Sequence, residues 1–77
     1  MGTFPSLSFS DLQNRLQSLG FQRQRQKGSH IRYVHPDGRK TTVPDHRSHD
    51  VPKGLLAKIV RHDLGMQIDE FFRATDK

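Results

Sequence analysis

The chain has 77 residues, no cysteine and no tryptophan, and only 31% of its residues are hydrophobic. A chain this short buries one small core, so we expect a single domain over residues 1–77, with a partner covering part of its surface. The lack of cysteine excludes a disulfide framework and a thiolate zinc site. There is neither a signal-like N-terminus nor an apolar run of roughly 20 residues, which favours a cytoplasmic protein without a membrane span.

The charge of the chain is strongly positive. Thirteen Lys and Arg residues outnumber eight Asp and Glu residues, which gives a formal net charge of +5. The cations are spread through the middle of the chain and do not follow one face of an amphipathic helix, as they would in a membrane-surface binder. This pattern favours nucleic acid as the partner, while any single cation is also compatible with a role in solubility.

The first predicted element is a helix over residues 11–19. Three leucines spaced at i, i+4 and i+7 form its apolar stripe, and Gly20 ends it. Ser10 is predicted to be the N-cap, with Gln13 completing a capping box. The preceding residues 1–9 exceed what the fold needs, so we expect this lead to be flexible or to contact the partner.

Three strands are predicted next, over residues 21–27, 30–35 and 40–43. The first alternates glutamine with Arg and Lys, as suits an exposed strand with cationic side chains. Residues 28–29 turn the chain into the second strand. Residues 36–38, with the sequence Pro-Asp-Gly, form a tight turn into the third, because proline presets φ and glycine accepts positive φ.

A second helix is predicted over residues 52–64, with Pro52 in its first turn and a wide apolar face ahead of Gly65. It follows an irregular, histidine-rich loop over residues 44–51. Ile68 and two phenylalanines after it are expected to form one amphipathic turn folded back on the core. The predicted fold is therefore α+β, in the order α-β-β-β-α, with two helices on one face of a three-stranded antiparallel sheet.

His30 is the candidate catalytic residue. It follows the Gly28-Ser29 turn and comes three residues after Lys27. Near neutral pH an imidazole can take a proton from a ribose 2′-hydroxyl or give one to a leaving oxygen, and neighbouring cations would stabilise the anionic phosphate. That reaction needs no metal or other cofactor. The alternative is a structural role, in which His30 caps the strand or binds a backbone carbonyl.

Several cations fall on or beside the predicted strands, where a sheet would present them together to a phosphate backbone. Each of these residues alone is readily explained by solvation, so the prediction depends on the cluster. With the turn before His30, the candidate RNA-binding residues are Arg23, Arg25, Lys27, Gly28, Ser29, Arg32, Arg39 and Lys40.

A histidine pair in the loop offers a weaker alternative. His46 and His49 lie three residues apart and are flanked by Asp45 and Asp50, a set that could in principle hold zinc. Loop histidines beside carboxylates are more often solvated, and Asp50 is better explained as a cap of the second helix. We therefore predict no metal site.

Four segments together resemble the HicA toxin family of mRNA interferases. They are KGSH at residues 27–30, HPDGR at 35–39, Val-Pro at 43–44 and VPKGLL at 51–56. Each segment alone is weakly specific, whereas their order and spacing are specific, and the resemblance spans nearly the whole chain.

The resemblance implies a fold like that of double-stranded-RNA-binding domains. It also implies the toxin of a type II toxin–antitoxin system, a metal-independent endoribonuclease that cuts mRNA and so blocks translation. A HicB-type antitoxin would mask the active site, and the catalytic histidine of the family falls on His30.

The chain departs from the family at the start of the second strand. Relatives often carry His or Arg followed by an aliphatic residue there, whereas here Ile31 precedes Arg32. A one-residue change of register reverses which side chains face the core. Either Arg32 shares the open face with His30, or the strand bulges to keep Ile31 buried.

Two other functions remain compatible with the sequence. A non-catalytic RNA-binding module would use the same basic sheet and follow the shape and backbone of RNA. An interaction protein would use its positive surface to complement an acidic partner, without nucleic acid. Turnover of RNA, and the salt dependence of RNA binding, separate these hypotheses.

Overall fold

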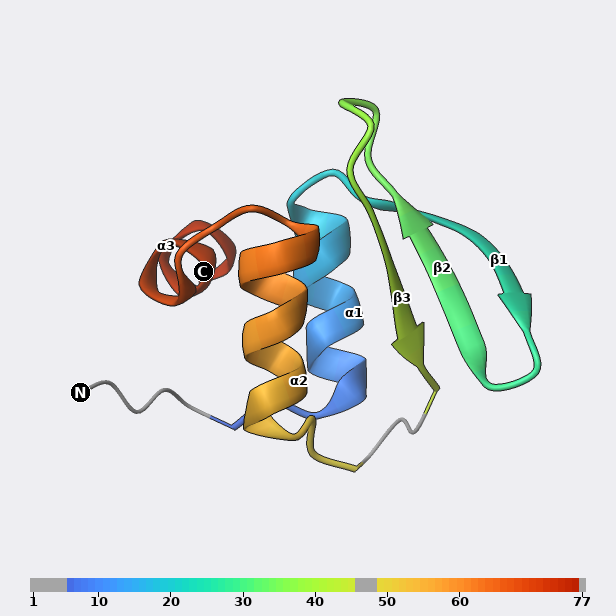
Figure 1. Ribbon diagram of the computed structural model, residues 1–77, viewed down its shortest axis with the longest axis horizontal. Helices are drawn as coiled ribbons and strands as arrows, with labels where there is room; N and C mark the ends of the chain where they lie inside the picture. Colours follow the sequence, from blue (N-terminus) through green and yellow to red (C-terminus); the bar gives the residue numbers. More distant parts are fainter. Residues whose placement is uncertain (1–5, 46–48, 77) are drawn as a thin grey trace.

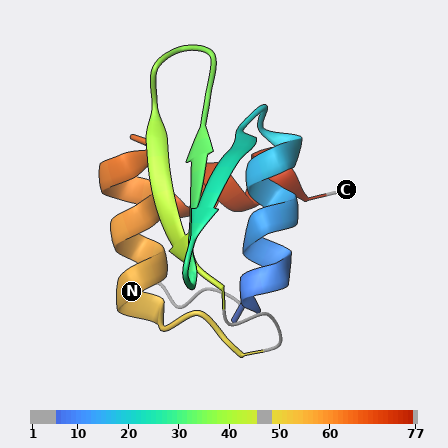
Figure 2. The ribbon, with the colours of Figure 1, turned by 90° about the vertical axis from the view of Figure 1, so that its right-hand side faces the viewer.

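The computed structural model describes residues 6–45 and 49–76. It contains a three-stranded antiparallel sheet in the order β1-β2-β3, with helices packed on one of its faces (Figures 1 and 2). The α+β architecture and the α-β-β-β-α order predicted from the sequence are confirmed. In chain order the elements are α1 (Phe9–Ser18), β1 (Gln22–Lys27), β2 (His30–Val34), β3 (Lys40–Pro44), α2 (Lys53–Lys58), the π-helical segment η1 (Ile59–Asp63) and α3 (Ile68–Thr75).

Helix α1 begins earlier than the sequence indicated. Its N-cap is Ser8, whose hydroxyl oxygen accepts a hydrogen bond of 3.1 Å from the backbone N–H of Asp11. The prediction of Ser10 as the cap, with Gln13 in a capping box, was wrong. The Gln13 side chain instead accepts a 2.7 Å hydrogen bond from the Tyr33 hydroxyl, so it joins the helix to the sheet.

The segment before α1 is tied to the loop before α2 by backbone hydrogen bonds. The N–H of Phe9 donates to the carbonyl of His49 at 3.0 Å, and the N–H of Val51 donates to the carbonyl of Leu7 at 2.7 Å. Ser8 and Asp50 form an isolated antiparallel bridge within this contact. This pairing holds Ser8 in an extended conformation, which is the backbone geometry that an N-cap requires.

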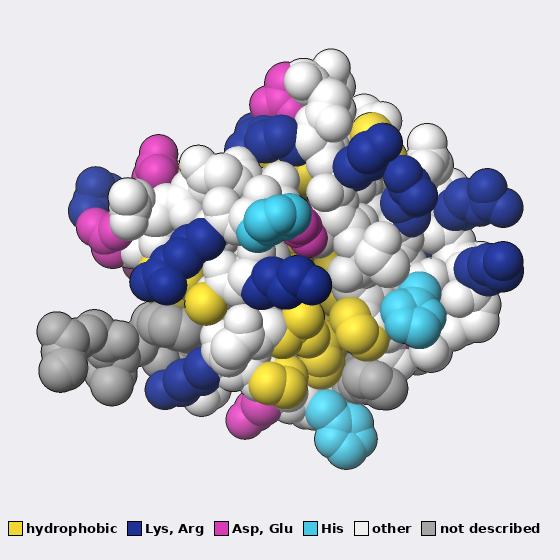
Figure 3. All heavy atoms as spheres, in the orientation of Figure 1, with side chains coloured by type: hydrophobic (Ala, Val, Ile, Leu, Met, Phe, Trp, Pro, Cys, Tyr) yellow, Lys and Arg dark blue, Asp and Glu magenta, His cyan; other side chains and the backbone are white. Residues whose placement is uncertain are grey.

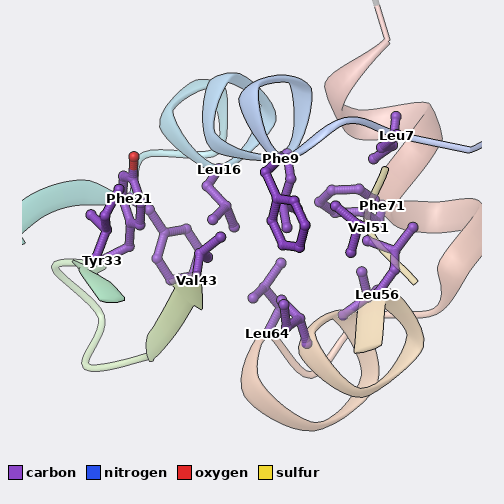
Figure 4. Packing of buried hydrophobic residues seen from close by; sticks show 14 residues of the cluster. Leu7, Phe9, Leu16, Phe21, Tyr33, Val43, Val51, Leu56, Leu64 and Phe71 are labelled. Carbon is purple, nitrogen blue, oxygen red and sulfur yellow. The ribbon is translucent and has the colours of Figure 1, made fainter. Parts of the chain in front are cut away.

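Part of the predicted N-terminal lead is core. Leu7 and Phe9 are each only 3% exposed and belong to the same hydrophobic cluster as Leu16, Val51 and Leu64 (Figure 4). The expectation that residues 1–9 exceed what the fold needs, and are flexible or contact the partner, is therefore wrong for Leu7 and Phe9. Residues 1–5 lie outside the described part of the chain.

The register of β2 against its neighbours determines which of its side chains face the helices and which face the open side of the sheet. Ile31 and Tyr33 are buried against the helices, whereas His30 and Arg32 are exposed on the open face. Of the two registers left open by the sequence, the first is correct: Arg32 shares a face with His30, and β2 itself has no bulge. Burial raises the pKa of the Tyr33 hydroxyl, which keeps its proton available to donate.

The predicted second helix is two continuous segments, α2 and η1. Pro52 is the N-cap residue and no side chain caps the helix, so the assignment of Asp50 as its cap was wrong. In η1 the N–H of Leu64 donates to the carbonyl of Ile59 at 2.9 Å, five residues back. This wider turn lets the adjacent residues Ile59 and Val60 both be buried in the core.

The C-terminal segment is a two-turn helix, longer than the single turn predicted. Helix α3 buries Phe71 completely, and its Thr75 hydroxyl accepts a 2.8 Å hydrogen bond from the Arg15 guanidinium of α1. Its start carries a capping box between Gln67 and Glu70. Among the described residues, no helix combines the length and apolarity needed to cross a membrane.

We expect the substitution Phe9→Ala to destabilise the fold by about 3–5 kcal/mol, because it leaves a cavity between α1 and the helices opposite. Denaturant unfolding followed by circular dichroism measures the change. The substitution Asn14→Ala, at an exposed position of the same helix, should shift the unfolding free energy by less than about 0.5 kcal/mol. Equal effects of the two substitutions would show that the N-terminal segment is not part of the core.

Candidate functional site

The turn between β1 and β2 places Lys27 directly opposite His30. Gly28 has a φ of +60°, a backbone conformation that residues with a Cβ adopt only at an energetic cost. A Cβ at this position would meet no neighbouring atom, so glycine is favoured here by the backbone conformation and not by crowding. The carbonyl of Ser29 accepts a 2.6 Å hydrogen bond from the N–H of Asp45. The turn is thereby joined to the end of β3, and it carries His30 at the start of the central strand.

A bulge at Gln24 decides which cations of β1 join His30. Arg23 pairs with Tyr33, whereas Arg25 pairs with Arg32, so one residue of β1 between them has no partner in β2. Strict alternation would put both arginines of β1 on one face, but the bulge separates them. Arg25 then shares the open face with Arg32, because residues paired across two antiparallel strands lie on the same face.

The open face of the sheet holds a shallow depression of about 250 Å³ around His30. None of its lining residues is acidic, and Figure 3 shows Lys and Arg side chains standing out over β1 and β2. His30 is exposed, and the described part of the chain offers its imidazole no hydrogen-bond partner. The depression is lined by Arg25, Lys27, His30, Arg32 and Thr42.

This arrangement can bind an anion and exchange a proton with it. Three cations surround a histidine whose two ring nitrogens remain available, so a phosphate bound there would lie beside a group able to donate or accept a proton. Because the cations are exposed, their attraction for an anion is expected to weaken with added salt. The sequence reasoning missed Thr42, although counting outward from the turn at residues 36–38 places it opposite Arg32.

Two of the predicted RNA-binding arginines do not reach this depression. Arg23 faces the other side of β1, where its guanidinium donates to the side-chain carbonyl of Gln26. Arg39 lies beyond the far end of β2, so it is separated from His30 by the length of the strand. Lys40 pairs with Val34 on the open face, so it belongs to the same face but lies at its opposite end.

Arg39 has a set of structural contacts. Its Nε donates to Asp37 Oδ2 at 2.8 Å, one terminal nitrogen donates to the carbonyl of Leu64 at 2.8 Å, and the guanidinium lies 5.3 Å from the centre of the Phe21 ring. The hydrogen bond to Leu64 satisfies a carbonyl at the end of η1. Arg39 therefore joins the turn between β2 and β3 to the helical layer.

The same turn is held by His35 and Asp37. The Nε2 of His35 lies 3.0 Å from the carbonyl oxygen of Leu19, so this nitrogen carries the hydrogen, and the ring packs edge-on against Phe21. The backbone N–H of Arg39 donates to Asp37, and this bond, with the Arg39 guanidinium and His35, lowers the pKa of the Asp37 carboxyl. A Cβ at Gly20 would come within 2.9 Å of the His35 ring.

The histidine pair considered for zinc lies partly outside the described residues. His46 lies outside them, and no group of three His, Asp or Glu residues within residues 6–45 and 49–76 could hold a metal ion. His49 is exposed at the end of the loop, and its carbonyl accepts the hydrogen bond from Phe9.

The fold and the depression define a class: a small basic α+β domain that presents a cationic, histidine-containing face of an antiparallel sheet. The sequence matches the family model described as the HicA toxin of bacterial toxin–antitoxin systems over residues 9–66, more than half of the chain. The chain therefore belongs to the HicA toxin family, and membership implies a cognate antitoxin. No curated protein sequence matches it significantly.

We expect Arg39→Gln to lower stability by about 1–3 kcal/mol, because it leaves the carbonyl of the buried Leu64 without its charged donor. The pKa of Asp37 should also move back toward its ordinary value of 3.8, although the backbone hydrogen bond remains. Since that pKa is lowered in the folded state, the stability that Asp37 contributes is present above its unfolded pKa and lost as pH falls through the folded one. Thermal unfolding and a carboxyl NMR titration measure both effects, and Arg25→Gln serves as the exposed control.

A deletion of Gln24 tests the bulge. Without this residue β1 becomes regular, and Arg25 and Lys27 keep their partners on the open face. Deleting Gln26 also shortens β1 by one residue, but the two-residue turn still pairs Lys27 with His30, so Arg25 should then lie opposite Ile31 and face the helices. Cross-strand NMR contacts between Arg25 and Arg32 should survive the first deletion and vanish in the second. Loss of these contacts in the Gln24 deletion would contradict the register.

Proposed function

We propose that this HicA-family toxin is a metal-independent endoribonuclease that binds and cleaves mRNA in the cytoplasm and thereby inhibits translation. The single observation that carries the proposal is the position of His30. Its exposed imidazole lies in a depression lined by Arg25, Lys27 and Arg32, and none of the lining residues is acidic. The family membership of the chain and the resemblance of its KGSH segment to the family's catalytic segment support the same residue.

The proposed reaction uses the neighbouring ribose as the nucleophile. His30 accepts the proton of the 2′-hydroxyl, the 2′-oxygen forms a bond to phosphorus, and the bond between phosphorus and the 5′-oxygen breaks. The 5′-oxygen takes a proton from water, and the resulting hydroxide takes the proton back from His30, so the products are a 2′,3′-cyclic phosphate and a 5′-hydroxyl. Arg25, Lys27 and Arg32 stabilise the negative charge that accumulates on the phosphate oxygens. DNA lacks the nucleophile and should remain intact.

The proposed partner of the toxin is a HicB-type antitoxin that covers the open face of the sheet. That face carries cations which the fold itself leaves uncovered, and the small core would gain stability from a covering partner. An acidic surface on the antitoxin would associate rapidly and would exclude RNA from the same depression.

The experiment is an RNA cleavage assay in EDTA, with products resolved on a denaturing gel and their ends identified by mass spectrometry. We expect the unmodified chain to cut RNA, and His30→Ala to reduce the rate by a factor of about 10²–10⁴. His49→Gln, which changes another exposed histidine away from the depression, should retain the rate. Replacing the riboses of the substrate by deoxyriboses should abolish cleavage.

Three results would contradict the proposal. Cleavage by His30→Ala at the full rate would remove His30 from the mechanism. Products ending in a simple 3′-hydroxyl would exclude the attack by the 2′-hydroxyl. Binding of RNA without turnover by either form would support the second function, a non-catalytic RNA-binding module.

A further inference from the structure

A second groove lies beside the depression, between the edge of β3 and the helical segment formed by α2 and η1. It has a volume of about 360 Å³ and is lined by Arg32, Lys40, Thr42, Lys58, His62 and Asp63, with Thr41 at its base. Figure 3 faces this groove and shows Lys, Arg and His side chains gathered where the helix meets the sheet. Three of these residues, Lys58, His62 and Asp63, come from the helical layer, and none of them was part of the site predicted from the sequence.

The groove and the depression adjoin each other. Arg32 and Thr42 line both, and they are direct partners across β2 and β3. Along this ladder His30 and Lys40 are separated by four residues, or about 13 Å at the rise of a strand. A single phosphate group cannot span this length. A polynucleotide bound at His30 is long enough to continue into the groove.

The one carboxylate of the groove is already occupied. The hydroxyl of the buried Thr41 donates to Asp63 Oδ2 at 2.8 Å, and His62 Nδ1 lies 3.0 Å from Oδ1. A carboxylate only accepts, so Nδ1 carries the hydrogen of the imidazole and Nε2 is the ring nitrogen available to a ligand. The side chain of His62 is 80% exposed, whereas that of Asp63 is 24% exposed. The groove therefore presents its cations and imidazole outward, with the acid held beneath them.

The cations of the groove have no acidic partner among the described residues. Within residues 6–45 and 49–76, Arg32, Lys40 and Lys58 form neither an ion pair nor a side-chain hydrogen bond, and all three are exposed. By contrast, Arg39 and Arg73 are each paired with an aspartate. Unpaired cations on both walls of one groove are suited to a ligand that carries negative charges at regular intervals, such as the phosphates of a nucleic acid.

We propose that this groove is a second phosphate-binding subsite for the same RNA strand whose scissile phosphate lies at His30. Lys58 from the helix and Arg32 and Lys40 from the sheet bind phosphate oxygens of the RNA. The imidazole of His62, held by Asp63, faces the RNA strand that lies between these cations. The inference rests on the proposed RNA binding and not on cleavage. An RNA strand fits better than an acidic peptide because the groove adjoins the His30 depression and shares Arg32 and Thr42 with it.

The test measures binding of a 2′-O-methyl oligoribonucleotide, which keeps the phosphates but lacks the attacking hydroxyl, by the unmodified chain and by Lys58→Gln. We expect Lys58→Gln to weaken binding several-fold at low salt and to reduce the slope of log K against log salt by about 1. The matched control is Arg61→Gln, which removes an exposed cation of η1 that does not line the groove and should leave the slope unchanged. Thermal unfolding of each variant checks that the fold is retained.

Oligonucleotide length provides a second measurement. A probe too short to reach from His30 to Lys58 should bind Lys58→Gln and the unmodified chain equally, whereas a long probe should distinguish them. His62→Asn, which leaves the lysine in place, should weaken binding of the long probe only.

The outcomes separate this subsite from the proposed nuclease activity. If Lys58→Gln and Arg61→Gln change the slope equally, the effect is general surface charge and the subsite is wrong, even if RNA is cut. If Lys58→Gln lowers the slope but RNA is never cut, the subsite stands and the nuclease proposal fails. If Lys58→Gln weakens binding of polyglutamate and leaves the oligonucleotide affinity unchanged, the groove serves an acidic protein and the inference is overturned.

Discussion

The site depends on the burial of Ile31 and Tyr33 beneath the helices. These two side chains alternate with His30 and Arg32 along β2, so burying the first pair exposes the second. A strand with one apolar face and one cationic face has only one register that keeps the cations in water. Burial of Tyr33 carries its hydroxyl into the interior. There the hydroxyl donates a hydrogen bond to the side chain of Gln13 in α1, so it is not left unpaired.

The small core is completed by segments at both ends of the chain. Leu7 and Phe9 enter it from the N-terminal side, and Phe71 of α3 enters it from the C-terminal side (Figure 4). Helix α3 lies beyond residues 9–66, the part of the chain that matches the HicA family. Its hydrogen bond between Thr75 and Arg15 joins it to α1, and this additional helix packs on the side of the helical layer that faces away from the sheet (Figures 1 and 2).

The positive charge of the protein is divided between two uses. Arg39 and Arg15 hold elements together through hydrogen bonds to a carbonyl and a hydroxyl, and each guanidinium also lies over an aromatic ring. Arg25, Lys27 and Arg32 are instead exposed around His30. Composition alone assigns the same charge to both groups, and only the contacts of each guanidinium distinguish a structural arginine from one available to a ligand.

The sequence by itself determined the order of the elements and the two turns around β2, because these follow from local periodicity and from the backbone preferences of proline and glycine. It could not decide the cap of α1, which depends on a backbone pairing with residues about 40 positions away. It also missed the bulge at Gln24, since a strand of exposed polar residues carries no pattern that specifies its register. Only the tertiary structure brought Lys58 and His62 of the helical layer beside Arg32 of the sheet, because no local signal reports which distant surfaces meet.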